Sequence, residues 1–136
     1  GVGSMVNPAW VHALDMTVDG RAVAAACGDG VVRTFGLFEG KPERRLELHR
    51  QRATCIAFPR NSPPHTLLSG GDDRRVILAN AEEPLDDEDI NPVLLDIDHH
   101  AKPNWIHYTA YGTAQPGPHF FVADTTSSLS AYTFRQ

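Results

Sequence analysis

The sequence GDGVVRTF at residues 28–35 decides the fold, because it recurs as DDRRVILA at residues 72–79. Asp29 aligns with Asp73 and Phe35 with Ala79, and both pairs are 44 positions apart. A weaker third copy, TTSSLSAY at residues 125–132, ends on Tyr132, 53 positions after Ala79. A repeat of about 20 to 50 residues is typical of architectures that stack one small unit several times. The acidic, turn-rich segment 82–89 accounts for the extra length before the third copy.

Short apolar runs between turn signals predict an all-β chain, since no window shows apolar residues at helical spacing. Turn residues such as Asp19-Gly20 and Gly28-Asp29-Gly30 separate the runs. The predicted strands are 11–16, 22–26, 31–35, 45–48, 54–58, 66–68, 76–78, 93–97, 105–108, 120–123 and 129–134.

A second pattern has the same period. Ile56 and Phe58 follow His49 at +7 and +9, and Ile106 and Tyr108 follow His99 at the same distances. The second unit combines a histidine before its first strand with an aspartate turn before its third. In the first unit Asn7 stands at the histidine position, and in the third unit Thr126 stands at the aspartate position.

A unit of this length, with four strands, that histidine and that turn, resembles the WD-repeat β-propeller family. The resemblance implies about three four-stranded blades, at 5–48, 49–97 and 98–136, with 82–89 as an acidic insertion. Three blades are too few for a closed ring, so we expect the chain to be a fragment of a propeller of seven blades. Its open faces would then contact the remaining blades or another copy.

The resemblance also implies a structural network of hydrogen bonds. In the second unit His49, Ser69 and Asp73 would form it, and Asp29 and His99 would take the matching places in the other two. The family's signature Trp is absent, because Phe35, Ala79 and Tyr132 stand in its place. Thr126 aligns with the aspartate in the third unit, so His99 is predicted to lack a charged partner unless Asp124 replaces it.

The function implied is a non-catalytic scaffold or adaptor for other proteins or peptides. Some family members of this type are proposed substrate receptors of cullin-RING ubiquitin ligases, and these often carry Trp-Asp-x-Arg after the third strand. The matching segments here, FGLF at 35–38 and ANAE at 79–82, lack the Arg. The alternative is an enzyme or ligand-binding propeller with its site in the channel or in other blades.

The composition argues against some classes of partner and favours one kind of compartment. The 136 residues carry a formal net charge of −5, which argues against nucleic-acid binding, and no apolar run is long enough to cross a membrane as a helix. The two cysteines, Cys27 and Cys55, lie in apolar runs and favour a reducing, intracellular compartment, cytoplasmic or nuclear.

Neither metal binding nor catalysis is predicted. His99, His100 and His107 are the densest histidine cluster, but no Cys or carboxylate recurs at ligand spacing. The acidic residues 86–89 lack the spacing of a calcium loop, and no nucleophile motif is present. We expect no cofactor.

A partner-binding surface is predicted on the loops before the first strands. Trp10, Arg50, Arg52 and Lys102 lie there and would form a rim for an acidic or polar peptide. The alternative is that Trp10 covers the end of its own blade and that the cations are ordinary solvated positions.

Overall fold

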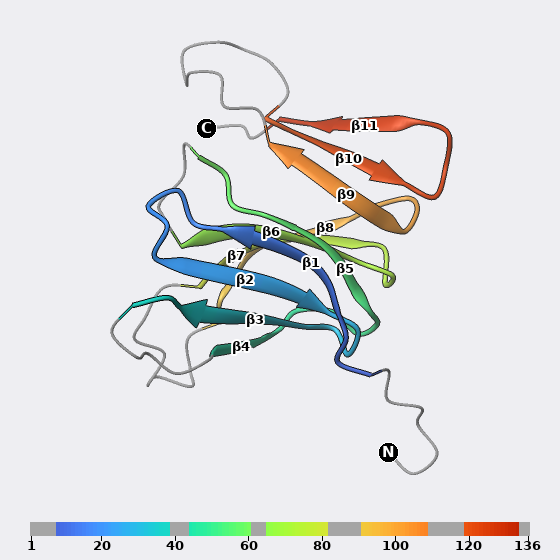
Figure 1. Ribbon diagram of the computed structural model, residues 1–136. Coiled ribbons are helices and arrows are strands. Elements are labelled where there is room, and N and C mark those ends of the chain that lie inside the picture. The colour runs from blue at the N-terminus through green and yellow to red at the C-terminus, as the bar shows by residue number, and fades with distance from the viewer. Residues whose placement is uncertain (1–7, 39–43, 61–64, 82–90, 109–118, 134–136) are drawn as a thin grey trace.

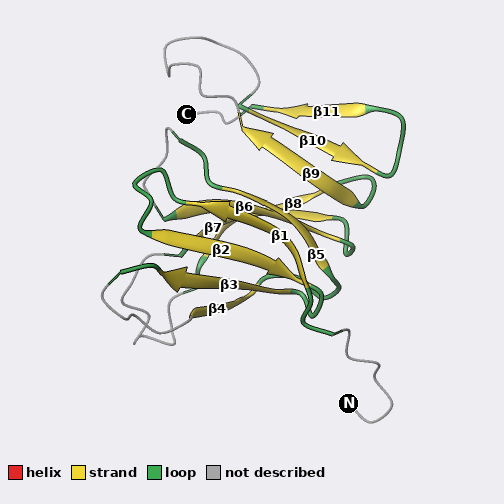
Figure 2. Cartoon of the chain, in the orientation of Figure 1, coloured by secondary structure: helices red, strands yellow, loops and turns green. Residues whose placement is uncertain are grey.

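The computed structural model describes residues 8–38, 44–60, 65–81, 91–108 and 119–133, and these form strands joined by turns and loops (Figures 1 and 2). The all-β prediction is confirmed. In the described ranges no helix is present that is long and apolar enough to cross a membrane. The acidic insertion at 82–89 and the predicted strand end at Phe134 lie outside the described residues.

The strands form three antiparallel sheets in chain order (Figure 1). In each sheet, consecutive strands are neighbours. Each predicted run overlaps one of the strands. The first sheet contains β1 (Val11–Met16), β2 (Ala22–Cys27), β3 (Val31–Gly36) and β4 (Arg44–Glu47); the second contains β5 (Ala53–Ala57), β6 (Thr66–Gly71), β7 (Arg75–Asn80) and β8 (Val93–Asp98); the third contains β9 (Pro103–Tyr108), β10 (Phe120–Asp124) and β11 (Leu129–Tyr132).

The second sheet is buried on both faces, and this explains its continuous apolar runs. Side chains alternate between the faces of a strand, so neighbouring residues in β5 enter different cores. Ile56 belongs to the core shared with the first sheet, whereas Cys55 and Ala57 belong to the core shared with the third. Leu67 and Leu68 of β6 divide in the same way, and both are fully buried.

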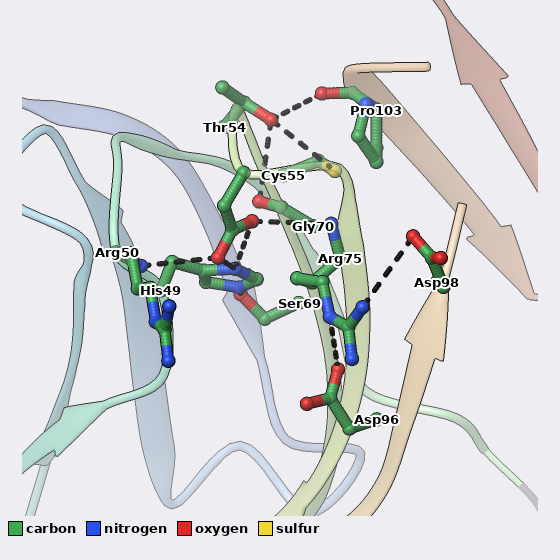
Figure 3. Close-up of polar contacts among 11 residues, drawn as sticks. His49, Arg50, Thr54, Cys55, Ser69, Gly70, Arg75, Asp96, Asp98 and Pro103 are labelled. Atoms are coloured by element: carbon green, nitrogen blue, oxygen red, sulfur yellow. Dashed lines mark hydrogen bonds and ion pairs between the residues drawn. The ribbon is translucent and has the colours of Figure 1, made fainter. Parts of the chain in front are cut away.

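The first strands of the three sheets lie side by side, β1 against β5 and β5 against β9. Asp15 Oδ2 accepts a hydrogen bond from the Phe58 backbone N–H at 2.8 Å, which joins the first and second sheets. The Thr54 hydroxyl donates to the Pro103 carbonyl at 2.5 Å, which joins the second and third (Figure 3). Gly70 is required beside this contact, because a Cβ there would lie 2.8 Å from the Pro103 Cβ.

The outward faces of the first and third sheets keep large apolar side chains in solvent. Leu14 of β1 is 64% exposed, and Trp105 of β9 and Leu129 of β11 are exposed to a similar degree. Two of the three sheets therefore present an apolar face that no described residue covers.

Candidate functional site

A histidine and an aspartate meet at one end of the second sheet. His49 Nδ1 lies 3.0 Å from Asp73 Oδ1, and its Nε2 lies 2.8 Å from Ser69 Oγ. A carboxylate can only accept, so Nδ1–H donates to Asp73, and Nε2 shares a second hydrogen bond with the Ser69 hydroxyl. The His49 side chain has no exposed surface. The three residues thus link the segment before β5, the strand β6 and the turn before β7, and Figure 3 shows His49 and Ser69 within this group.

Asp73 has two further donors. Its carboxylate accepts from the backbone N–H of Arg50 at 3.1 Å and of Arg75 at 3.2 Å. Burial alone would raise the pKa of Asp73, but the hydrogen bond and charge of His49, with the two backbone donors, outweigh it and leave the pKa below its ordinary value. The carboxylate is therefore held in its ionised form.

The third sheet has its own histidine–carboxylate pair. His99 Nε2 lies 2.8 Å from Asp124 Oδ2, and neither side chain has exposed surface. The Tyr132 hydroxyl lies 2.5 Å from His99 Nδ1, on the other side of the ring. The alternative stated for His99, that Asp124 replaces Thr126 as its charged partner, is the arrangement in the structure. Thr126 instead donates its hydroxyl and its N–H to Asp124 Oδ1, which lowers the pKa of Asp124.

The length of the turn explains that misalignment. The second and third strands are separated by residues 28–30 in the first sheet and 72–74 in the second, but by the longer segment 125–128 in the third sheet. In each sheet one aspartate accepts a hydrogen bond from the N–H two residues later, which is an Asx turn. The pairs are Asp29 with Val31, Asp73 with Arg75, and Asp124 with Thr126.

The first sheet replaces the histidine with an arginine. Asp29 receives two hydrogen bonds from the guanidinium of Arg33, at 3.0 and 2.7 Å. This bidentate pair lowers the pKa of Asp29 and raises that of Arg33. Asp29 is thus ion-paired within its own hairpin, whereas Asp73 and Asp124 reach back to the segments before β5 and β9.

The predicted rim residues occupy equivalent positions in the three sheets. The carbonyls of Trp10, Arg52 and Lys102 each accept a hydrogen bond from the turn between the second and third strands of their sheet. The donors are Gly28, Asp72 and Thr125, respectively. These bonds place the start of each first strand beside that turn.

Backbone hydrogen bonds also join these ends of neighbouring sheets to one another. The His49 N–H donates to the Gly30 carbonyl, and the His99 N–H donates to the Arg74 carbonyl. Trp10, Arg52 and Lys102 therefore lie at one common end of the stacked sheets. Arg50 also lies there, because its N–H binds Asp73.

The side chains at this end are accessible. Trp10 is 70% exposed, so its ring does not cover the end of its sheet. Arg50 and Lys102 are exposed, and Arg52 forms an ion pair with Asp72 at 2.9 Å while staying about half exposed. A hollow of about 390 Å³ lies beside Arg50 and is also lined by Arg75. Asp73 and Asp96 also line this hollow, whereas Trp10 does not.

Of the three histidines weighed as metal ligands, two come together. His100 Nε2 lies 3.2 Å from Asp124 Oδ2, and the His99 and His100 rings are stacked obliquely with centroids 4.3 Å apart. His107 lies on β9 with its side chain exposed and is not part of this group. Asp124 is 25 positions from His99 in sequence and was predicted only as an alternative partner; its place in the repeated Asx turn was the stronger signal.

A larger open groove, of about 710 Å³, runs along the first strands of the three sheets. Its walls include residues of β1, β5 and β9, among them Cys55. Burial raises the pKa of the Cys55 thiol to about 11, so this sulfur is not an activated nucleophile. The carboxylates with lowered pKa, Asp29, Asp73 and Asp124, do not line the groove.

No model of a known protein family matches the chain, and no curated protein matches it.

Proposed function

We propose that the chain forms blades of a WD-repeat-type β-propeller and acts as a non-catalytic platform for protein–protein interaction. The observation that carries the proposal is the repeated end structure. The aspartate turn and the carbonyl–amide bond recur in all three sheets, and a buried histidine–carboxylate pair recurs in the second and third. In a propeller, this repetition holds the loops of every blade at one face of the ring.

The order of the strands supports the blade assignment. Each sheet is a meander of neighbouring antiparallel strands, and the first strands of successive sheets contact one another. Propellers place the first strand of each blade beside a central axis. The exposed apolar faces of the first and third sheets are the surfaces that further blades would cover.

The interaction surface we propose is the common end with Trp10, Arg50, Arg52 and Lys102. Trp and Arg are enriched in interface hot spots, and here an exposed Trp and two arginines lie at the same end of the sheets. The cations favour a partner segment that is acidic or polar. Docking to a ubiquitin ligase is not included, because Phe35–Phe38 and Ala79–Glu82 lack the Arg of the Trp-Asp-x-Arg segment.

The test is capture of partners from cells by the full chain, followed by mass spectrometry and measurement of affinity with the purified partner. Trp10→Ala and the double variant Arg50→Glu/Arg52→Glu should each reduce affinity about tenfold or more, as interface hot spots do. Arg45→Glu is the matched control, because Arg45 is an exposed cation on β4, outside this end. Full affinity in both rim variants would refute the assignment of the surface.

A second candidate is binding of a small molecule in the groove along β1, β5 and β9. Its volume of about 710 Å³ is within the range of about 300 to 1,000 Å³ that is common for small-molecule sites. A screen for ligands that raise the melting temperature tests this function. Loss of the ligand-induced shift on Leu14→Trp, at an exposed position that lines the groove, would support it.

A further inference from the structure

Three potential metal ligands converge at the end of the third sheet. His99, His100 and Asp124 each offer one ligand atom, and these atoms all lie within 4.8 Å of one another. Asp124 Oδ2 is 2.8 Å from His99 Nε2 and 3.2 Å from His100 Nε2. Adjacent residues of a strand point to opposite faces. His99 and His100 can face the same carboxylate because β8 ends at Asp98, before them.

We propose that His99, His100 and Asp124 form a binding site for a divalent transition metal of the Zn²⁺ class. This site is separate from the protein–protein interaction function and does not depend on it. The donor set of two imidazole nitrogens and one carboxylate oxygen is one that Zn²⁺ uses in proteins, with a water molecule as the fourth ligand. The thiols of Cys27 and Cys55 are buried elsewhere and take no part.

The distances fit a metal after a small adjustment. Tetrahedral Zn²⁺ with bonds of about 2.0 to 2.2 Å holds its ligand atoms about 3.3 Å apart. The His100–Asp124 separation of 3.2 Å already matches, and the His99–Asp124 separation of 2.8 Å must open by about 0.5 Å. The ligand nitrogens of the two histidines lie within 4.8 Å of each other and must approach by up to about 1.5 Å, which the exposed His100 side chain can supply. The His100 side chain is 55% exposed, so the ion and its water can enter from solvent.

Other residues form hydrogen bonds with the ligand side chains and would hold them in place around a metal ion. Asp124 Oδ1 is occupied by the N–H of Thr126 at 2.7 Å and by its hydroxyl at 2.5 Å, so Oδ2 remains for the ion. When Nε2 of His99 binds the metal, its proton moves to Nδ1, which then donates to the Tyr132 hydroxyl oxygen. Such partners on the far side of a ligand fix its orientation and its tautomer.

The test uses the full chain without a histidine tag, stripped of metal by a chelator and titrated with ZnCl₂ in a calorimeter. We expect one site per chain. Removing a residue that only supports a metal ligand usually weakens metal binding by about tenfold or more. His100→Ala removes a ligand itself, so we expect Zn²⁺ affinity to fall by more than about tenfold. His107→Ala is the matched control, since His107 is exposed on β9 of the same sheet, outside the ligand set, and should bind normally.

A second measurement separates binding at this site from binding elsewhere. Because Zn²⁺ binds the folded chain, it should raise the melting temperature of the wild type and of His107→Ala, but not of His100→Ala. The His100→Ala variant keeps the buried His99–Asp124 pair, so it should fold, and circular dichroism checks this. Absence of binding by the wild type, or equal binding by His100→Ala, would overturn the proposal.

Discussion

The carboxylate of Asp15 on β1 accepts a hydrogen bond from the backbone N–H of Phe58, which follows β5, at 2.8 Å. The two residues are 43 positions apart and belong to different sheets, so the bond fixes how the first sheet sits against the second. Asp15→Ala would leave that N–H without its acceptor in a partly buried position. We expect a loss of about 1 to 3 kcal/mol of unfolding free energy in urea titrations, as is usual for a hydrogen bond to a charged group.

Asp15→Asn is the informative control for this prediction. Its amide oxygen can still accept from Phe58, so it should lose clearly less stability than Asp15→Ala. Equal losses in the two variants would mean that the hydrogen bond to Phe58 contributes little.

The two buried histidines should be of similar importance to stability. His49→Ala leaves Asp73 without its ring donor, and we expect a cost of about 1 to 3 kcal/mol. The alignment of Thr126 with Asp73 predicted a smaller cost for His99→Ala. Because His99 is bound by both Asp124 and Tyr132, we now expect comparable destabilisation. Thermal melts of both variants test this, and a much milder effect of His99→Ala would contradict the pairing with Asp124.

The sequence predicted the strands and one of the two histidine pairs, for identifiable physical reasons. Strand periodicity and turn residues are local signals, and the spacing of His49 and Asp73 follows the repeat. Asp124 was predicted only as the alternative to Thr126 as partner of His99, because the longer turn at 125–128 moves the aspartate relative to β11. The pairing of Asp29 with Arg33 depends on hairpin geometry and side-chain rotamers, which spacing alone does not specify.

Stability should fall as the solution becomes acidic, in part through Asp73. Its pKa is lowered in the folded chain, whereas an unfolded Asp has a pKa of about 3.9. A lowered pKa means that the stabilisation is present above about pH 4 and is lost as the pH falls toward the folded value. The gap in unfolding free energy between wild type and Asp73→Asn should therefore narrow between pH 6 and pH 3.

Ser69→Ala serves as the control for the pH experiment. This variant loses the hydrogen bond between Ser69 and His49 but keeps the Asp73 carboxylate. The difference in unfolding free energy between Ser69→Ala and the wild type should therefore change less between pH 6 and pH 3. A gap for Asp73→Asn that stays constant with pH would show that the folded pKa of Asp73 is not lowered.

The thiols should be protected in the folded chain. Cys55 is buried between the second and third sheets, and burial raises its pKa to about 11, so little thiolate exists at pH 8. Cys27 is buried on β2. We expect a chromogenic disulfide reagent to react with neither cysteine in buffer and with both in concentrated urea. Rapid reaction of one thiol in buffer would indicate that its sheet opens readily.

Gly30 and Arg74 occupy the same place in successive hairpins, and substitutions there should have opposite effects. Both have positive φ, +86° and +64°, and both carbonyls accept from the histidine that precedes the next sheet. At Gly30 a Cβ would lie 2.2 Å from the His49 backbone oxygen. Gly30→Ala adds this clash to a left-handed strain of about 1 to 2 kcal/mol, so we expect a loss above about 2 kcal/mol.

Arg74 is exposed and already carries that left-handed strain. Arg74→Gly removes the strain but increases the entropy of the unfolded chain by an amount worth about 0.5 to 1 kcal/mol, so the net effect should be neutral or stabilising by up to about 1 kcal/mol. Arg74→Ala, which keeps a Cβ, should stay close to the wild type. Urea unfolding of the three variants checks the contrast. If Gly30→Ala loses no more unfolding free energy than Arg74→Ala, the turn at Gly30 can move away from the His49 backbone at little cost, and the prediction is wrong.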